Sequence, residues 1–185
     1  MSNYTKDWFD VRGLKTWDKL LENRDIKTAL EIGCYEGRAS VFLLKKFPEM
    51  ELTVIDQFFD DVTTAPDYAG YEPGYENRFD LNTMPYADRV IKFKGDSLVH
   101  LASEIFRDEK YDFIYVDGDH RTFPAVRDCI MAWDLLRPGG MMVIDDFDEI
   151  PEVNYAANLF LNALPEGSYK EYTTEDGEQL VIERI

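Results

Sequence analysis

The sequence has few cysteines and no long apolar run. Its 185 residues include two cysteines, Cys34 and Cys129, and these are far apart, so a disulfide framework is not expected. The first residues carry no apolar signal core, and no stretch approaches the length that spans a membrane. We therefore expect a cytoplasmic protein that does not contact a membrane.

Positive charge is also scarce. The chain has 20 lysine and arginine residues against 37 aspartate and glutamate residues, which gives a net charge of −17. Such a surface repels a phosphate backbone, and no basic run is longer than Lys45-Lys46, so nucleic acid is not an expected partner. The acidity has two interpretations, which are solubility in a crowded interior and attraction of cationic ligands.

What the chain does have is an alternating pattern of apolar segments. Short, largely β-branched runs indicate buried parallel strands at residues 29–32, 52–55, 90–93, 113–116 and 141–144. Helical periodicity predicts helices at 39–47, 98–106, 124–136 and 153–164, with a leading helix at 8–21 within residues 1–25. Residues 169–173 and 179–184 are expected to form a closing antiparallel hairpin. The pattern and the length predict a single α/β domain over residues 1–185.

One segment, residues 57–85, interrupts the alternation. It mixes acidic with aromatic side chains and has no clean period in its first half, whereas residues 75–84 are expected to be helical. The aromatic content argues against plain disorder. Two interpretations stay open, a lid over a substrate or cofactor and an ordinary surface insertion.

A glycine turn follows the first expected strand with the spacing Glu31-x-Gly33-x-x-x-Gly37. Gly33 permits a sharp bend, and Gly37 lets the start of a helix approach a ligand without an intervening Cβ. Asp56, at the end of the next strand, is placed to accept hydrogen bonds from ribose hydroxyls. These features indicate a nucleoside cofactor. Because Glu31 suits a positively charged cofactor and a third fingerprint glycine is missing, S-adenosylmethionine is favoured over a nicotinamide cofactor.

Groups suited to binding follow all five expected parallel strands. Ligands of open α/β sheets bind beyond the carboxyl ends of the strands, so these groups are expected to meet at one edge of the sheet. In strand order they are Gly33 to Gly37, then Asp56 and Gln57, then Gly95, Asp96 and Ser97, then Asp117 to His120, and finally Asp145 and Asp146.

Asp117, Asp145 and Asp146 would repel one another strongly at one sheet edge unless a positive charge lay between them. An oxygen-rich set without sulfur suits Mg²⁺, Mn²⁺ or Ca²⁺. The alternative is that one aspartate caps a helix and another faces solvent. His120 is placed to take a proton from a substrate hydroxyl, and its alternative roles are to cap the following helix or to pair with Asp119.

On these residues the chain resembles class I S-adenosylmethionine-dependent methyltransferases, and more narrowly a small bacterial and phage group with a YDFIYVDGDH strand end. The matching passages are ALEIGCYEGRAS, VIDQF, NRFDLN with DRVIKFKGDS, YDFIYVDGDH and AWDLLRPGGMMVIDDF, and they cover nearly the whole chain. The resemblance implies a Rossmann-like, doubly wound, seven-stranded sheet that is mainly parallel, with its last strand antiparallel. It also implies that the methionine end of the cofactor lies at the glycine turn, the ribose at Asp56 and the adenine near Asp96 and Ser97. The full predicted cofactor set is Glu31, Gly33, Cys34, Tyr35, Glu36, Gly37, Ser40, Asp56, Gln57, Gly95, Asp96, Ser97 and Asp117.

This group is similar to the metal-dependent O-methyltransferases of catechol, caffeoyl-thioester and macrolide-sugar type. The resemblance implies that Asp117, Asp145 and Asp146 hold Mg²⁺. His120 stands where the catechol and caffeoyl types have a catalytic lysine, and Ala39, followed by Ser40, stands where many relatives have a serine. We therefore predict that the chain methylates a hydroxyl of a small molecule, with His120 and Asp117 as catalytic residues. An S-adenosylmethionine-binding protein without transferase activity and a nicotinamide-dependent oxidoreductase are the alternatives. The oligomeric state, a homodimer included, stays open.

Overall fold

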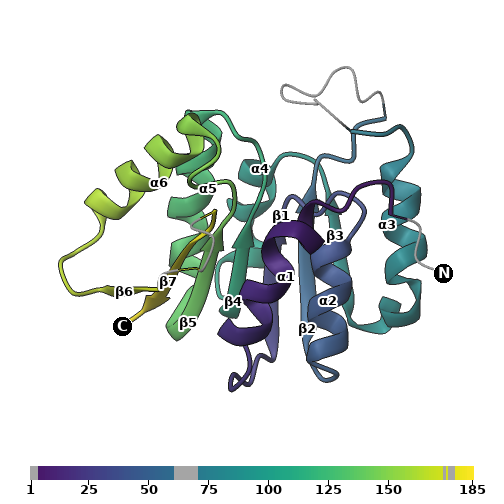
Figure 1. Ribbon diagram of the computed structural model, residues 1–185, viewed down its shortest axis with the longest axis horizontal. Coiled ribbons are helices and arrows are strands. Elements are labelled where there is room, and N and C mark those ends of the chain that lie inside the picture. The colour runs from purple at the N-terminus through teal and green to yellow at the C-terminus, as the bar shows by residue number, and fades with distance from the viewer. Residues whose placement is uncertain (1–3, 61–70, 173, 175–177) are drawn as a thin grey trace.

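A seven-stranded sheet forms the centre of the molecule. The computed structural model describes residues 4–60, 71–172, 174 and 178–185. The strand order is β3-β2-β1-β4-β5-β7-β6 (Figure 1), with bounds β1 Thr28–Ile32, β2 Glu51–Asp56, β3 Val90–Lys94, β4 Tyr111–Val116, β5 Leu136–Ile144, β6 Tyr169–Tyr172 and β7 Leu180–Arg184. All pairs from β3 to β5 are parallel, and β7 is antiparallel to both β5 and β6. The predicted mainly parallel sheet with a closing antiparallel hairpin is confirmed.

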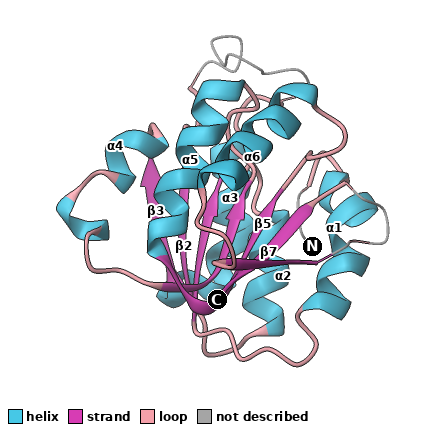
Figure 2. Cartoon of the chain, turned by 90° about the vertical axis from the view of Figure 1, so that its left-hand side faces the viewer, coloured by secondary structure: helices cyan, strands magenta, loops and turns pink. Residues whose placement is uncertain are grey.

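Helices cover both faces of the sheet (Figure 2). One face packs against α1 (Trp8–Leu20), α2 (Arg38–Lys46) and α3 (Tyr75–Thr83), and the other packs against α4 (Ser97–Leu101), α5 (Thr122–Leu135) and α6 (Pro151–Ala163). Successive strand residues serve opposite cores because side chains alternate along a strand. In β4, for example, Phe113 belongs to the first core and Ile114 to the second. The double coverage explains the buried apolar runs of the central strands β1, β2 and β4.

Two expected boundaries were wrong. The helix predicted over residues 98–106 ends at Leu101, because Ser103 adopts an extended conformation (φ −77°, ψ 159°), and a separate 3₁₀ helix, η3 (Glu104–Phe106), follows. The strand predicted to start at Met141 begins at Leu136. The register of β5 against β4 shifts between Leu136 and Met141. The proline and the two glycines in this stretch therefore interrupt the strand pairing, whereas the sequence predicted that they precede the strand.

The segment at residues 57–85 is described in part. Its second half forms α3, as predicted, followed by the 3₁₀ helix η2 (Met84–Arg89). Residues 61–70 lie outside the described residues, so the lid and the surface insertion both stay predictions.

Within the described residues, no helix is long and apolar enough to cross a membrane.

The strand order places the functional edge. The chain runs outward from β1 through β2 to β3, and then returns to the other side of β1 with β4 and β5. The loops that follow β1 and β4 therefore leave in opposite directions, and a crevice opens between them at the carboxyl ends of the strands. This is the position at which the sequence predicts a ligand.

Candidate active site

Two adjoining cavities lie at this edge of the sheet. The larger has a volume of about 530 Å³ and is bounded by the glycine turn, the ends of β4 and β5, and the segment leading into α1. The smaller has a volume of about 250 Å³ and lies over the ends of β2 and β3 and the start of α5. The two cavities share the lining residues Gly33, Asp56, Tyr71 and Arg121.

The predicted cofactor residues divide between these cavities. The larger is lined by Glu31, Cys34, Tyr35, Glu36 and Asp117, and the smaller by Gln57, Gly95, Asp96 and Ser97. Gly33 and Asp56 line both, whereas Gly37 and Ser40 are absent from the described lining of either. Most of the predicted cofactor residues therefore line these two adjoining cavities, as expected for residues that follow parallel strands.

The two glycines of the turn are required for different reasons. Gly33 has φ 81°, and a Cβ added there would lie 1.8 Å from the carbonyl oxygen of Asp117, so the turn passes directly against the end of β4. Gly37 has φ 75°, but its added Cβ would lie 2.9 Å from the ring of Phe79. Gly37 thus permits close packing between α2 and α3, which differs from the ligand approach that its position in the sequence suggested.

Asp56 fastens the glycine turn to the end of β2. Its Oδ2 accepts hydrogen bonds from the backbone N–H groups of Cys34 at 2.8 Å and Tyr35 at 2.9 Å. Its Oδ1 accepts one from the N–H of Phe58 at 2.8 Å and one from the hydroxyl of Tyr75 at 3.2 Å. Burial raises the pKa of Asp56, and the backbone hydrogen bonds oppose that rise. The carboxylate therefore holds the wall between the cavities in shape, including Tyr35, which has a left-handed φ of 47°.

Glu31 and Glu36 have partners inside the protein. The hydroxyl of Ser40 donates to Oε2 of Glu31 at 2.5 Å, and burial raises the pKa of Glu31 well above its usual range. Glu36 accepts hydrogen bonds from the backbone N–H and the hydroxyl of Thr5, at 2.6 and 2.7 Å, and forms an ion pair with Arg78. Glu36 therefore connects the glycine turn with the leading segment and with α3.

A polar cluster lines the smaller cavity. Asp96 caps α4 by accepting a hydrogen bond from the N–H of Leu98 at 2.8 Å. The hydroxyl of Ser97 donates to Oδ1 of Asp128 at 2.7 Å, and Nη2 of Arg127 donates to Oγ of Ser97 at 3.0 Å. Burial raises the pKa of Asp128 to about 6. The sequence pattern did not indicate Arg127 and Asp128, because they lie within α5 and do not follow a strand.

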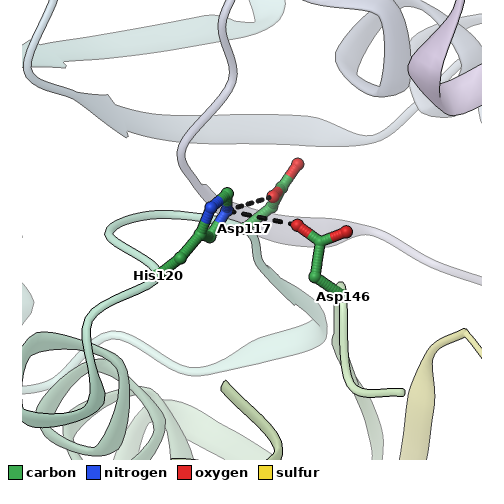
Figure 3. A group of neighbouring side chains, drawn as sticks. All are labelled: Asp117, His120 and Asp146. Carbon is green, nitrogen blue, oxygen red and sulfur yellow. Dashed lines mark ion pairs between the residues drawn. The ribbon is translucent and has the colours of Figure 1, made fainter. Parts of the chain in front are cut away.

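Asp117, His120 and Asp146 converge at the ends of β4 and β5 (Figure 3). Nε2 of His120 lies 3.3 Å from Oδ2 of Asp146 and 3.6 Å from Oδ1 of Asp117. One ligand atom from each of the three lies within 4.8 Å of the other two, a spread that fits coordination of one cation. Asp146 has a left-handed φ of 53°, and its side chain points toward His120 (Figure 3). The structure therefore brings two of the three predicted metal ligands together with the predicted base.

Asp145 is arranged differently from the prediction. It lines the same cavity, but the compact group contains His120 in its place, and Oδ1 of Asp145 accepts a hydrogen bond from the side-chain amide of Gln179 at 2.6 Å. Its charge still acts on Asp117. Burial raises the pKa of Asp117 to about 8, and repulsion from Asp145 adds to the rise.

His120 does not cap the following helix, and Asp119 accepts hydrogen bonds from Arg121. The N-cap of α5 is Arg121, and this cap has no side-chain hydrogen bond. Asp119 pairs with Arg121, whose backbone N–H and Nε both donate to Oδ1 of Asp119 at 2.9 Å. The imidazole faces the two aspartates of the site instead.

The raised pKa of Asp117 predicts a dependence of stability on pH. Its carboxyl group keeps a proton up to about pH 8 in the folded protein but only up to about pH 4 in the unfolded protein. In the absence of a cation, this group therefore adds most to the free energy of unfolding at low pH. We expect this contribution to disappear as the pH rises through about 8, which lowers the melting temperature. Thermal unfolding between about pH 5 and 9 in a chelator tests this. Asp117→Asn should flatten the slope, and an identical slope in both proteins would contradict the raised pKa.

Comparison with known proteins agrees with this geometry. The model of a family described as "Methyltransferase domain" matches residues 30–147, which is more than half of the chain. The chain therefore belongs to this methyltransferase family. An uncharacterised protein of Acanthamoeba polyphaga mimivirus is 22% identical over 165 residues, which cover 82% of this chain and 67% of that protein.

Solved structures share the fold at low sequence identity. The O-methyltransferase from Bacillus cereus, in complex with S-adenosylhomocysteine, has a TM-score of 0.68 and 15% identity, with 100% of this chain and 83% of that chain covered. The O-methyltransferase TomG from Streptomyces achromogenes is involved in tomaymycin synthesis and was solved with S-adenosylmethionine. It has a TM-score of 0.64 and 18% identity, with 92% and 78% covered. The fold is that of class I S-adenosylmethionine-dependent methyltransferases. The family match favours methyl transfer over the two alternatives raised by the sequence.

Proposed function

We propose that this protein transfers the methyl group of S-adenosylmethionine to a hydroxyl oxygen of a small molecule, with a divalent cation beside that hydroxyl. The observation that carries the proposal is the position of the Asp117, His120 and Asp146 group. It lies on the wall of the larger cavity, which adjoins a second, polar cavity across the glycine turn.

The smaller cavity suits the adenosine part of the cofactor. Its wall offers the carboxylate of Asp96 and the hydroxyl of Ser97, which can bind the polar edge of a base. The glycine turn lies between the two cavities, so the methionine part would extend over Gly33 toward Asp117. Asp56 stands at the junction, where the ribose is expected.

The donor set at the carboxylate group suits a hard cation. Asp117 and Asp146 supply oxygen atoms, Asp145 adds a third negative charge nearby, and no sulfur is present in the group. A cation bound there would lower the pKa of a coordinated hydroxyl. His120 faces the same position, so its imidazole can accept the hydroxyl proton. Methyl transfer is an in-line displacement that depends on orientation, so the walls of the larger cavity would also have to align the acceptor.

The charge of the larger cavity predicts the charge of the acceptor. Its described carboxylates are Glu31, Glu36, Asp56, Asp117, Asp145, Asp146, Glu149 and Glu152. The basic side chains on the described wall are already paired, since Lys6 lies 3.4 Å from Glu72, and Arg38 and Arg121 form ion pairs with Asp10 and Asp119. An anionic acceptor would therefore find no unpaired lysine or arginine on the described wall.

We therefore expect neutral or cationic hydroxylated acceptors to have a kcat/KM at least about 10-fold higher than that of a carboxylated analogue of the same length. A dihydroxyphenyl amine and the matching dihydroxyphenyl acid provide this comparison at fixed ring chemistry. A preference for the acid would show that the acidic wall does not select the acceptor.

Calorimetric titration tests the cofactor part of the proposal. S-Adenosylhomocysteine should bind with one site per chain, and NAD⁺ at the same concentration should give no heat of binding. Asp56→Ala should weaken the binding of S-adenosylhomocysteine by about 1.5 to 3 kcal/mol, because the glycine turn loses its acceptor. Binding of NAD⁺ in preference to S-adenosylhomocysteine would contradict the proposal.

A further inference from the structure

A buried hydrogen-bond chain connects α1 to the carboxylate group. The indole Nε1–H of Trp17 donates to Oε1 of Gln179 at 2.9 Å, and Nε2 of Gln179 donates to Oδ1 of Asp145 at 2.6 Å. Trp17 is fully buried, and Gln179 is 4% exposed. Gln179 immediately precedes β7, so the chain joins α1, the last strand and the end of β5.

Trp17 fixes which way the amide of Gln179 faces. A glutamine amide presents an oxygen acceptor at one end and an NH₂ donor at the other, and the two ends have nearly the same shape. An indole N–H can only donate, so it requires the oxygen end of the amide. The NH₂ end must then face Asp145. The Asp145 carboxylate therefore receives a donor whose orientation is set by a residue in a different layer of the fold.

Asp145 also lies beside the catalytic group. Its backbone N–H donates to the carbonyl oxygen of Val116 at 3.0 Å, and Asp117 is the residue that follows Val116. The hydroxyl of Tyr115 donates to Oδ2 of Asp117 at 3.2 Å. The next residue, Asp146, lies 3.3 Å from His120. Two consecutive acids are thus held by different partners, Asp145 by Gln179 and Asp146 by His120.

We infer that Gln179 is a positioning residue for the cation group. It holds the Asp145 carboxylate beside Asp117, and Trp17 sets the direction of its amide. The inference rests on the proposed function, because it gives Asp145 a part in binding the cation. Partners that hydrogen-bond to ligating side chains orient those side chains, and their loss typically lowers metal affinity or activity by about 10- to 100-fold.

The test measures Mn²⁺ binding directly, by electron paramagnetic resonance of the free ion in titrations of the whole protein. Gln179→Leu removes the donor, and Gln179→Met also removes it while keeping an unbranched side chain of similar length. Both should raise the Kd of Mn²⁺ by about 10-fold or more. Trp17→Phe should raise it less, by about 3-fold, because the amide is still present but no longer oriented. The Kd of S-adenosylhomocysteine should stay within about 2-fold of wild type in all three variants, since Gln179 is not part of the described cofactor wall.

The matched control is Glu183→Gln. Glu183 lies in β7 and pairs with Arg24 at 2.7 Å, so this variant also loosens the last strand but does not touch the site. Its melting temperature should fall while its Mn²⁺ affinity stays at the wild-type value. Wild-type Mn²⁺ affinity in both Gln179 variants would overturn the positioning role. An equal loss of affinity in Glu183→Gln would also overturn it, because general loosening of the strand would then explain the effect. A wild-type protein that binds no Mn²⁺ would instead contradict the cation step of the proposed function, and this inference with it.

Discussion

Replacing His120 with alanine is expected to lower kcat by about 10²- to 10⁴-fold, the usual contribution of a general base. The imidazole lies 3.3 Å from Asp146 and 3.6 Å from Asp117, on the wall of the cavity assigned to the acceptor. Without it, the acceptor hydroxyl keeps the cation but has no side chain to take its proton. The affinity for S-adenosylhomocysteine should stay within about 2-fold of wild type, since the loss lies in the chemical step.

The second histidine of the chain provides the control. Nε2 of His100 lies 3.0 Å from the carbonyl oxygen of Lys94, and its ring packs against Phe93. His100→Ala should therefore leave kcat nearly unchanged. Measuring Mn²⁺ affinity alongside kcat separates two roles of His120. A base affects kcat alone, whereas a ligand affects both. A His120→Ala protein with full kcat would refute either role in the reaction.

Gly33→Ala is expected to destabilise the fold by about 3 kcal/mol or more, near the upper end for overpacking. The added Cβ would lie 1.8 Å from the carbonyl oxygen of Asp117 and 2.9 Å from the Cα of Gly118, and both are backbone atoms at the end of β4. Either the glycine turn or that strand end must move. Binding of S-adenosylhomocysteine should be lost as well, because both cavities include Gly33.

Replacement of Gly139 with alanine distinguishes the cost of the steric clash from the cost of the left-handed backbone conformation. The φ of Gly139 is 78°, close to the 81° of Gly33, but an added Cβ there has no neighbour within 4 Å. Gly139→Ala should therefore cost only the conformational penalty, about 1 kcal/mol. Urea unfolding of both variants measures the difference. Similar losses of stability would show that the turn does not press against β4.

Much of the fold followed from the sequence because both faces of the sheet are covered. Burial on two sides gives the central strands β1, β2 and β4 apolar runs, and the turn residues between runs mark the strand ends. The helix after β3 was predicted too long, because residues 102 and 103 form a turn that helical periodicity does not reveal. The early start of β5 was missed for a related reason, since proline and glycines in the strand form an irregularity and not a boundary.

The site was predictable where it depends on strand ends. Asp117, His120 and Asp146 each follow a strand directly or nearly so, and parallel strands bring such residues together. The contacts that organise the site were not predictable. Gln179 is 162 residues from Trp17 in sequence, and no period or motif links two residues at that separation. The position of Asp145 outside the compact group was not predictable for a similar reason. Its partner Gln179 is 34 residues away in the sequence, and no motif links the two.

The most direct test of the account is a methyl-transfer assay with S-adenosylmethionine labelled at the methyl carbon. The protein, freed of metal with a chelator and then supplied with Mg²⁺, would be incubated with a panel of neutral and cationic hydroxylated acceptors. Mass spectrometry and carbon NMR would then identify the labelled product. We expect label on an acceptor oxygen, with little product in the chelator and full yield once Mg²⁺ is restored. Label on nitrogen or carbon, or the same yield with and without the cation, would contradict it.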